Sequence, residues 1–268
     1  MAPRFSRPRL LSVDDRQYRA FLAQIMLGKD NQRPTRPPRA RELFGSEAEA
    51  ALRDWLSQQC NLSERRILEY FEHRGRSAVK KYRELDAVEL AGKTVHVFEI
   101  KASQKATSLR RALRQLHDTR ALLSMLFAHV STTIMLVDTG IPTAEEVTAL
   151  MSGPEPPPIP PPTLDDMLAA LPQIHLIKTL DERDTNPDVV NLLRFSVDDI
   201  IAMVGAEHLH LDWEEPEEEP LQEPVENLTT PYATFTADQT ANDQDEDEGS
   251  LGAALRQAFQ GRKGNDRD

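Results

Sequence analysis

The sequence has a single cysteine and no long apolar run, and each shortage excludes a class of protein. Cys60 is alone among 268 residues, so an intramolecular disulfide framework and a cysteine-based zinc site are both excluded. This cysteine use predicts a reducing, cytoplasmic setting. No run approaches the ~18 apolar residues of a membrane span, and the start lacks the apolar stretch of a signal peptide, so we expect no association with membranes. A Gly-x-Ser-x-Gly elbow is also missing, which argues against a Ser-His-Asp hydrolase.

Basic charge is missing from one long stretch near the C-terminus. Residues 205–250 contain fifteen Asp and Glu but no Lys or Arg, so with a net charge of −12 the other 222 residues carry +3. Residues 1–41 hold ten Lys and Arg against three Asp. A basic arm and an acidic tail therefore bracket a nearly neutral middle, and the overall acidity does not exclude a nucleic-acid partner.

Hydrophobic spacing and breaker residues divide the chain into six segments. The expected segments are a basic N-terminal helix and arm (1–42), a core (43–152), a proline-rich spacer (153–163), a C-terminal extension of the core (164–204), a disordered acidic tail (205–250) and a short terminal helix (251–268). Within the first segment we predict a helix over 12–27, followed by a linker rich in Pro and Arg.

The core segment predicts the order helix, strands, helix, strand. A helix over 43–60 is expected to begin at a Ser46 cap and to bury the stripe Ala48, Leu52, Trp55 and Leu56. A strand over 66–72 precedes two β-prone runs, RELDAVEL and KTVHVFEIK, which the turn AGK joins into a hairpin. The remaining expectations are helices over 107–130, 143–151, 164–171 and 196–204 and strands over 131–140 and 174–180.

The hairpin places charged residues where they can act together. Alternate side chains of a strand share a face, so Glu99 and Lys101 point the same way. Ile100, with Val97 and Val95, is expected to form an apolar layer on the other face. Asp86 lies on the preceding strand, across from Glu99. Two close carboxylates repel unless a cation lies between them, and oxygen ligands suit Mg²⁺ or Mn²⁺, while a nearby lysine orients or deprotonates the attacking water.

This pattern resembles the PD-(D/E)xK, or restriction-endonuclease-like, nuclease superfamily, whose signature is an acid, a short hairpin and then acid-x-Lys. Here these are Asp86 and the run Glu99-Ile100-Lys101. The setting is most similar to the Holliday-junction-resolvase and RecB-like branches, over roughly residues 43–140. Leu85 stands where the usual Pro precedes the first acid. The resemblance implies an α/β fold with a restriction-endonuclease-like core, in which helices flank a central mixed β-sheet.

Those branches add a glutamate from the preceding helix, often in a Gly-x-x-x-Glu setting, which Gly45 and Glu49 match. Glu47 is the competing choice, but Glu49 has Leu52 and Leu56 three and seven positions later and fits better. Some branches also place a glutamine on the helix after the lysine, where Gln115 stands. The resemblance thus implies Asp86, Glu99 and Glu49 as metal ligands and Lys101 beside the attacking water. Together with Gln115 they form the implied catalytic set.

The leading hypothesis is a metal-dependent nuclease acting on DNA, with RNA less favoured, in phage defence, mobile-element biology or repair. The alternative is a catalytically silent nucleic-acid-binding or assembly module. A phosphate-binding rim is expected from Lys80, Lys81, Lys105, Arg110, Arg111 and Arg114, with Arg74, Arg76, Arg83 and Arg120 as further candidates. A protein partner for the acidic tail or terminal helix and a homodimer remain open. His208 and His210 have metal-ligand spacing but lack convergent partners, so we expect no metal there.

Overall fold

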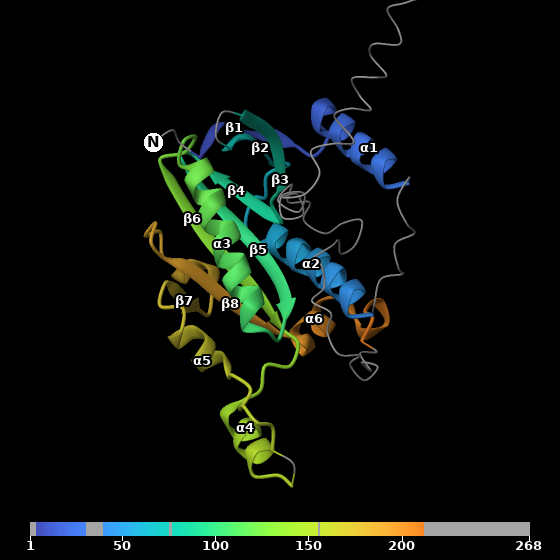
Figure 1. Cartoon of the computed structure of the whole chain (residues 1–268), viewed down its shortest axis with the longest axis vertical. Coiled ribbons are helices and arrows are strands. Elements are labelled where there is room, and N and C mark those ends of the chain that lie inside the picture. Colours follow the sequence, from blue (N-terminus) through green and yellow to red (C-terminus); the bar gives the residue numbers. More distant parts are fainter. Residues whose placement is uncertain (1–3, 31–39, 75–76, 155, 212–268) are drawn as a thin grey trace, which may run out of the picture.

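The computed structural model describes residues 4–30, 40–74, 77–154 and 156–211, which contain both strands and helices (Figure 1). The strands are β1 (Phe5–Ser12), β2 (Arg65–Arg74), β3 (Ser77–Glu84), β4 (Ala87–Ala91), β5 (Thr94–Ser103), β6 (His129–Asp138), β7 (Ile174–Ile177) and β8 (Val190–Ser196). The α-helices are α1 (Arg16–Asp30), α2 (Ala40–Gln59), α3 (Ala106–Leu123), α4 (Ala144–Met151), α5 (Leu164–Ala169) and α6 (Val197–Val204). Two short 3-10 helices are η1 (Leu180–Glu182) and η2 (Ala206–His208).

The strands form two sheets. The smaller sheet is antiparallel, in the order β1-β2-β3. The larger sheet has the order β4-β5-β6-β8-β7, in which β4 and β5 are antiparallel and the other neighbours are parallel. Helices flank this mixed sheet, so the α/β class and the central mixed sheet expected from the sequence are confirmed.

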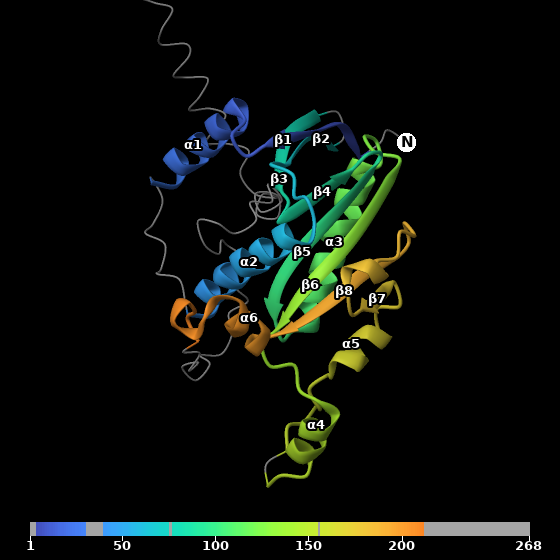
Figure 2. The ribbon, with the colours of Figure 1, turned by 180° about the vertical axis from the view of Figure 1, so that it is seen from behind.

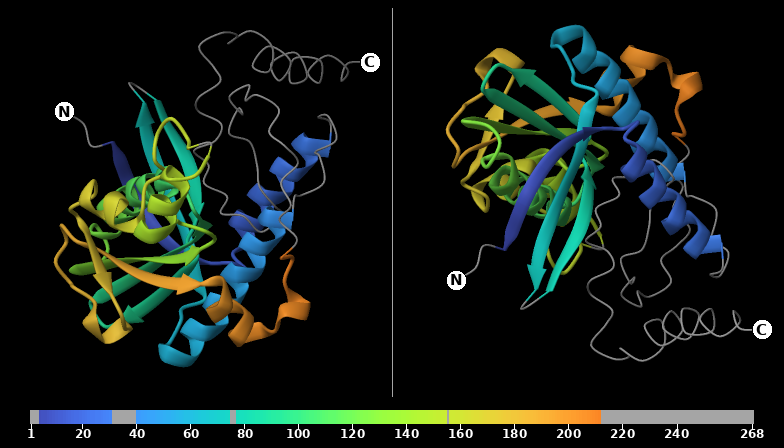
Figure 3. Two further views of the ribbon diagram at one scale, coloured as in Figure 1. Left: turned by 90° about the horizontal axis from the view of Figure 1, so that it is seen from below. Right: turned by 90° about the horizontal axis from the view of Figure 1, so that it is seen from above.

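Helices cover both faces of the larger sheet. Helix α3 lies in front of the sheet in Figure 1 and behind it in the reverse view of Figure 2. Its Leu109 and Leu116 share a buried cluster with Val97 of β5. Helices α2 and α6 pack on the other face, where Leu52 shares a second cluster with Phe98. Figure 3 shows α2 and α3 on opposite sides of the sheet.

The apolar layer of β5 differs from the one expected. Val95 and Val97 pack under α3, whereas Phe98 and Ile100 pack under α2. Placing Val95 and Val97 on the same face as Ile100 was therefore wrong. Val97 and Val95 lie three and five positions before Ile100, and side chains alternate along a strand, so an odd offset places them on the opposite face.

The chain passes from the smaller sheet to the larger one at Leu85 and Asp86. Glu84 is the last residue of β3 and pairs with Ile67 of β2, whereas Ala87 begins β4 and pairs with Phe98 of β5. The run RELDAVEL was expected to form one strand, but it contributes to two. The hairpin around AGK is confirmed, with β4 ending at Ala91 and β5 beginning at Thr94.

The N-terminal segment contains a strand that the sequence analysis missed. Residues 5–12 were included in a basic arm, but they form β1 and pair with β2. The register shifts between Ser6 and Arg9, where Arg7 has a φ of 51° and Pro8 follows. A proline is tolerated on an edge strand at such an irregularity, so the arginine and proline content concealed the strand.

Two expected helix ends were wrong. Helix α2 begins at Ala40, so Ser46 lies within it and donates a hydrogen bond to the Glu42 carbonyl at 3.4 Å instead of capping the helix. Helix α3 ends at Leu123 instead of residue 130, and the apolar Met125 and Leu126 beyond it are exposed. The apolar pattern continues beyond Leu123, and no Gly or Pro marks the end of the helix, so the sequence predicted a longer helix.

The C-terminal part of the described chain completes the larger sheet. Helices expected over 143–151, 164–171 and 196–204 are confirmed as α4, α5 and α6, and the strand expected over 174–180 is β7. Strand β8 was missed, although it lies between β6 and β7. Residues 31–39 of the Pro- and Arg-rich linker, the acidic tail beyond residue 211 and the terminal helix over 251–268 lie outside the described residues. No helix within the described ranges is both long and apolar enough for a bilayer.

Candidate active site between β4, β5 and α2

Asp86 lies at the point where the chain leaves one sheet for the other. Its side chain is 1% exposed, and its Oδ2 accepts a hydrogen bond from the backbone N–H of Ile100 at 2.6 Å. Its Oδ1 is buried and has no hydrogen-bond partner in the described part of the chain. Because Ala87 pairs with Phe98, Asp86 stands level with Glu99 on the neighbouring strand. A buried carboxylate oxygen without a partner is costly, so this atom is a place for a ligand.

Glu99 and Lys101 follow on β5 and share one face of the strand, as expected. Glu99 is buried, and the Lys101 Nζ lies 2.6 Å from its Oε1. The Lys101 side chain is 21% exposed, so it is only partly buried. Two carboxylates and one ammonium therefore converge where β4 and β5 meet.

The charges of this cluster do not balance. Burial raises the pKa of Asp86 well above its usual value, and the charge of Glu99 raises it further, whereas Lys101 acts against the shift. For Lys101, burial acts to lower the pKa, but Glu99 and Asp86 together more than reverse this effect and raise it. Within this set, a single ammonium lies beside two carboxyl groups.

Glu49 of α2 lies within the field of the same cluster. Burial raises its pKa and Glu84 adds to the effect, while Arg53 and Lys101 act against it. Its charge in turn contributes to the raised pKa values of Asp86 and Lys101. The structure therefore brings Glu49 toward the site that was expected to include it.

Glu47, the competing helical glutamate, has a different partner. It accepts hydrogen bonds from the backbone N–H of His210 at 2.8 Å and pairs with the Nδ1 of the same residue at 2.5 Å. His208 lies 3.7 Å from Glu207. Glu47 thus ties α2 to the segment after α6. Within the described ranges, no three His, Cys, Asp or Glu side chains are grouped to hold a metal ion, either here or around Asp86.

Gln115 lies on α3, beside Arg83 of β3. Its backbone carbonyl accepts a hydrogen bond from Arg83 Nη1 at 2.9 Å, and its side-chain Oε1 is buried without a hydrogen-bond partner in the described chain. None of the hydrogen bonds in the described ranges joins Gln115 to Asp86, Glu99 or Lys101. The structure does not bring it into the polar contacts of the cluster.

The basic residues expected to form a rim divide into two groups. Lys105, Arg110, Arg111 and Arg114 are exposed at the start and along the outer side of α3. Lys80 is half-buried and pairs with Glu69 at 2.6 Å. Lys81 is 5% exposed and pairs with Glu72 at 3.1 Å, so the prediction that it belongs to a phosphate-binding rim was wrong. Its side chain points into the protein instead of toward solvent.

Two further arginines of that rim are structural. Arg83 is buried and donates to Thr119 Oγ1 at 2.9 Å. Arg120 donates to the Val189 carbonyl at 2.8 Å and also bonds Thr132. These two side chains link strands and helices instead of facing a ligand. The side chain of Arg74 and all of Arg76 fall outside the described part.

Arg53 was not identified from the sequence, yet it belongs to the site. It stands one helical turn after Glu49 on α2, and its Nη2 is buried without a hydrogen-bond partner in the described chain. Burial lowers its pKa, and the like charge of Arg66 lowers it further, whereas Glu49, Asp86 and Glu84 act in the opposite direction. The i to i+4 spacing from Glu49 was the signal that could have found it.

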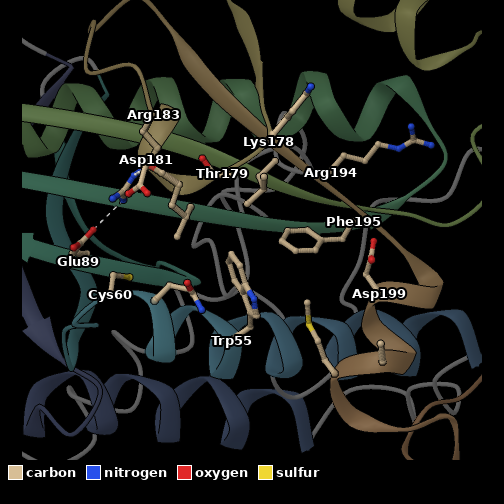
Figure 4. A pocket seen from close by; sticks show the side chains of 15 residues that line it. Trp55, Cys60, Glu89, Lys178, Thr179, Asp181, Arg183, Arg194, Phe195 and Asp199 are labelled. Carbon is tan, nitrogen blue, oxygen red and sulfur yellow. Dashed lines mark hydrogen bonds and ion pairs between the residues drawn. The ribbon is translucent and has the colours of Figure 1, made fainter.

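A separate pocket of about 680 Å³ opens between α2, β8 and α6 (Figure 4). Trp55 and Phe195 contact edge to face at its floor, with ring centroids 5.4 Å apart. Arg183 and Glu89 form an ion pair of 3.0 Å at one end. None of the side chains of the Asp86 cluster lines this pocket, so this pocket and the converging acids are different places.

The chain matches no family model, no curated protein and no solved structure.

Proposed function

We propose that this chain is a metal-dependent nuclease that hydrolyses phosphodiester bonds of DNA, with RNA the less favoured substrate. The observation that carries the proposal is the convergence of two buried carboxylates, Asp86 and Glu99, with a single lysine, Lys101, at the edge of a mixed sheet. The packing of an α/β core does not require these three charged side chains. Burying charge costs free energy, and such groups are typically found at functional sites.

The fold supports the same proposal. In the core segment the order is α2, the strands β2 to β5, α3 and β6, which agrees with the expected order of helix, strands, helix and strand. We propose that this arrangement is a restriction-endonuclease-like core. Asp86 directly precedes β4, Glu99 lies on its antiparallel neighbour β5, and the helix before them supplies Glu49.

The chemistry of the site fits Mg²⁺ or Mn²⁺. Magnesium is commonly bound through one or two carboxylates and keeps several waters, so the pair Asp86 and Glu99 suffices without a closed group of three ligands. The buried Oδ1 of Asp86 has no hydrogen-bond partner among the described residues and is free to bind. Bound there, the ion would polarise a phosphoryl oxygen and acidify water. Glu49 is the third acid in its field.

Lys101 works as a cation in this proposal. Its pKa is raised, because Glu99 and Asp86 more than offset the effect of burial, so it stays protonated at neutral pH. An ammonium donates hydrogen bonds and offsets phosphate charge, but it does not remove a proton from water. Of the two roles expected from the sequence, orienting the water is therefore favoured over deprotonating it. Glu99 holds the ammonium in place at 2.6 Å.

Cleavage assays on single-stranded, duplex and branched DNA, with Mg²⁺ or Mn²⁺, test the proposal. The wild type should cut at least one of these substrates, and Lys101→Ala should reduce the rate by at least ~100-fold, because a transition-state donor of this kind contributes about that factor. Lys93→Ala is the matched control: its side chain is exposed in the turn before β5, outside the predicted rim, and the variant should keep most of the activity. Wild-type protein that leaves all three substrates intact with both metals contradicts the proposal.

The second candidate is a nucleic-acid-binding module without catalysis. The observation that favours it is that, within the described ranges, no three metal-ligating side chains come together. Binding titrations on the same three DNA substrates separate the two: tight binding without cleavage in either metal would support the module.

A further inference from the structure

Arg53 is surrounded by charged groups but is joined to none of them. It lies one turn after Glu49 on α2, within the field of Asp86, Glu84 and Arg66. Its Nη2 is buried, and no hydrogen bond or ion pair involves its guanidinium within the described ranges. Arg66 differs, because it is paired with Glu84 and also donates to the Leu85 carbonyl at 3.3 Å.

This arrangement is unfavourable in the absence of an anion. A guanidinium has five donors, and a buried donor without a partner costs free energy. The nearby charge of Arg66 adds repulsion, and burial and Arg66 together outweigh the nearby carboxylates, so the pKa of Arg53 is lowered overall. A group whose burial is not offset inside the protein is expected to find its partner in a ligand.

We propose that Arg53 binds a phosphate of the nucleic-acid backbone at the site formed by Asp86, Glu99 and Lys101. This inference rests on the proposed nuclease function. Guanidinium groups match phosphate oxygens in a bidentate geometry. Arg53 approaches from α2, whereas Lys101 approaches from β5, so the two cations contact the strand from different elements. Arg53 is thus a binding residue that positions the strand over Asp86.

A structural role predicts different contacts. Arginine four residues after a glutamate commonly forms an ion pair along a helix. Here no ion pair joins Arg53 to Glu49 among the described residues, and Glu84 is already paired with Arg66. Removing Arg53 should therefore leave the thermal unfolding midpoint nearly unchanged, whereas Arg66→Ala should lower it.

The experiment compares Arg53→Ala and Arg53→Lys with Arg41→Ala, a control on the same helix whose guanidinium contacts Thr139 Oγ1 at 3.3 Å. With a DNA duplex that the wild type cuts, Arg53→Ala should raise KM about 10- to 100-fold, the loss expected for one charged hydrogen-bonded contact. The slope of log Kd against the logarithm of the salt concentration should fall by about one, because one phosphate contact is lost. Arg53→Lys should recover part of the affinity, and Arg41→Ala should resemble the wild type.

Neutral phosphates then locate the contact. In a series of duplexes that each carry one methylphosphonate, the wild type should lose affinity at one position near the cut site where Arg53→Ala loses nothing further, as a double-mutant cycle requires for interacting partners. An unchanged KM and salt dependence in Arg53→Ala, or additive losses at every position, would overturn the inference. So would a loss of stability matching the loss of affinity.

The two proposals fail separately. If the wild type cuts DNA and Arg53→Ala is indistinguishable from it, only the role of Arg53 is wrong. If the wild type does not cut, fluorescence anisotropy of the same duplex in Ca²⁺ still measures the salt dependence and the methylphosphonate coupling. In that case the nuclease proposal fails, and the binding data alone decide whether Arg53 contacts phosphate.

Discussion

At the scale of residues, the site is defined by a mismatch between charge and burial. Asp86 is 1% exposed, and only one of its carboxylate oxygens has a hydrogen-bond partner in the described chain. Ionising it beside Glu99 is unfavourable without a metal ion. The protein thus holds a carboxyl group that is destabilising when charged, a common property of residues kept for binding or catalysis.

Asp86→Asn should change how stability depends on pH. The pKa of Asp86 is raised in the folded protein by burial and by Glu99. Its protonated form therefore favours folding below the unfolded pKa, near 3.8, and this contribution is lost as the pH rises through the higher folded pKa. Asn keeps the acceptor for the Ile100 N–H but cannot ionise. In metal-free buffer, the thermal unfolding midpoint of the wild type minus that of Asp86→Asn should decrease as the pH is raised from 4 to 8.

Metal addition supplies the control for this prediction. Mg²⁺ should raise the unfolding midpoint of the wild type at pH 8, because a ligand that binds only the folded state stabilises it. Asp86→Asn should show little increase and should not cleave DNA. A difference between wild type and variant that is independent of pH would show that Asp86 does not titrate in the folded protein.

At the scale of elements, helix starts depend on contacts that the sequence pattern describes only in part. Ser196 accepts a hydrogen bond from the Asp199 N–H at 3.1 Å, and Asp199 accepts one from the Ser196 N–H at 2.7 Å, so this pair forms a capping box for α6. Ser46 was expected to cap α2 but lies inside it. The same residue type therefore has different importance at the two positions.

Replacing these serines by alanine should separate the two roles. Ser196→Ala should lower the free energy of unfolding by about 1 kcal/mol, the usual cost of losing a helix cap. Ser46→Ala should change it by less than ~0.5 kcal/mol, because alanine is the better residue within a helix. Urea unfolding of the three proteins measures both values. A cost for Ser46→Ala as large as that for Ser196→Ala would mean that α2 begins near Ser46 in solution.

At the scale of the whole molecule, the distribution of charge bears on binding. Residues 205–250 carry fifteen acids and no basic residue, whereas the rest of the chain carries +3. The described structure extends to residue 211. Within its last residues, Leu209 is buried and His210 contacts Glu47. A truncation after Gly205, which the charge count alone suggests, would remove these contacts. Truncation after Leu211 keeps them and still removes fourteen of the fifteen acids.

This truncation should tighten DNA binding at low salt. A tethered acidic segment competes with phosphates for the exposed basic residues of α3 at a high local concentration. The difference should shrink at physiological salt, where the Debye length is ~8 Å. Binding titrations at two salt concentrations measure it, with a full-length variant carrying Asn and Gln for the fourteen acids as the control. Equal affinities of truncated and full-length protein at low salt would leave the tail with a role in solubility only.

The hairpin, the shared face of Glu99 and Lys101, and most helices of the described core could be predicted from the sequence alone. These features depend on local periodicity and on a turn around Gly92, whose φ of 63° suits glycine. The strand β1 and the break between β3 and β4 depend on pairing between residues far apart in the chain, so the fold alone establishes them. The strand β8 and the burial of Lys81 likewise follow from how strands pack in the folded protein. The same holds for Arg53: its spacing from Glu49 is visible in the sequence, but only the packing of α2 in the folded protein buries its Nη2, within the field of Asp86, without a hydrogen-bond partner in the described chain.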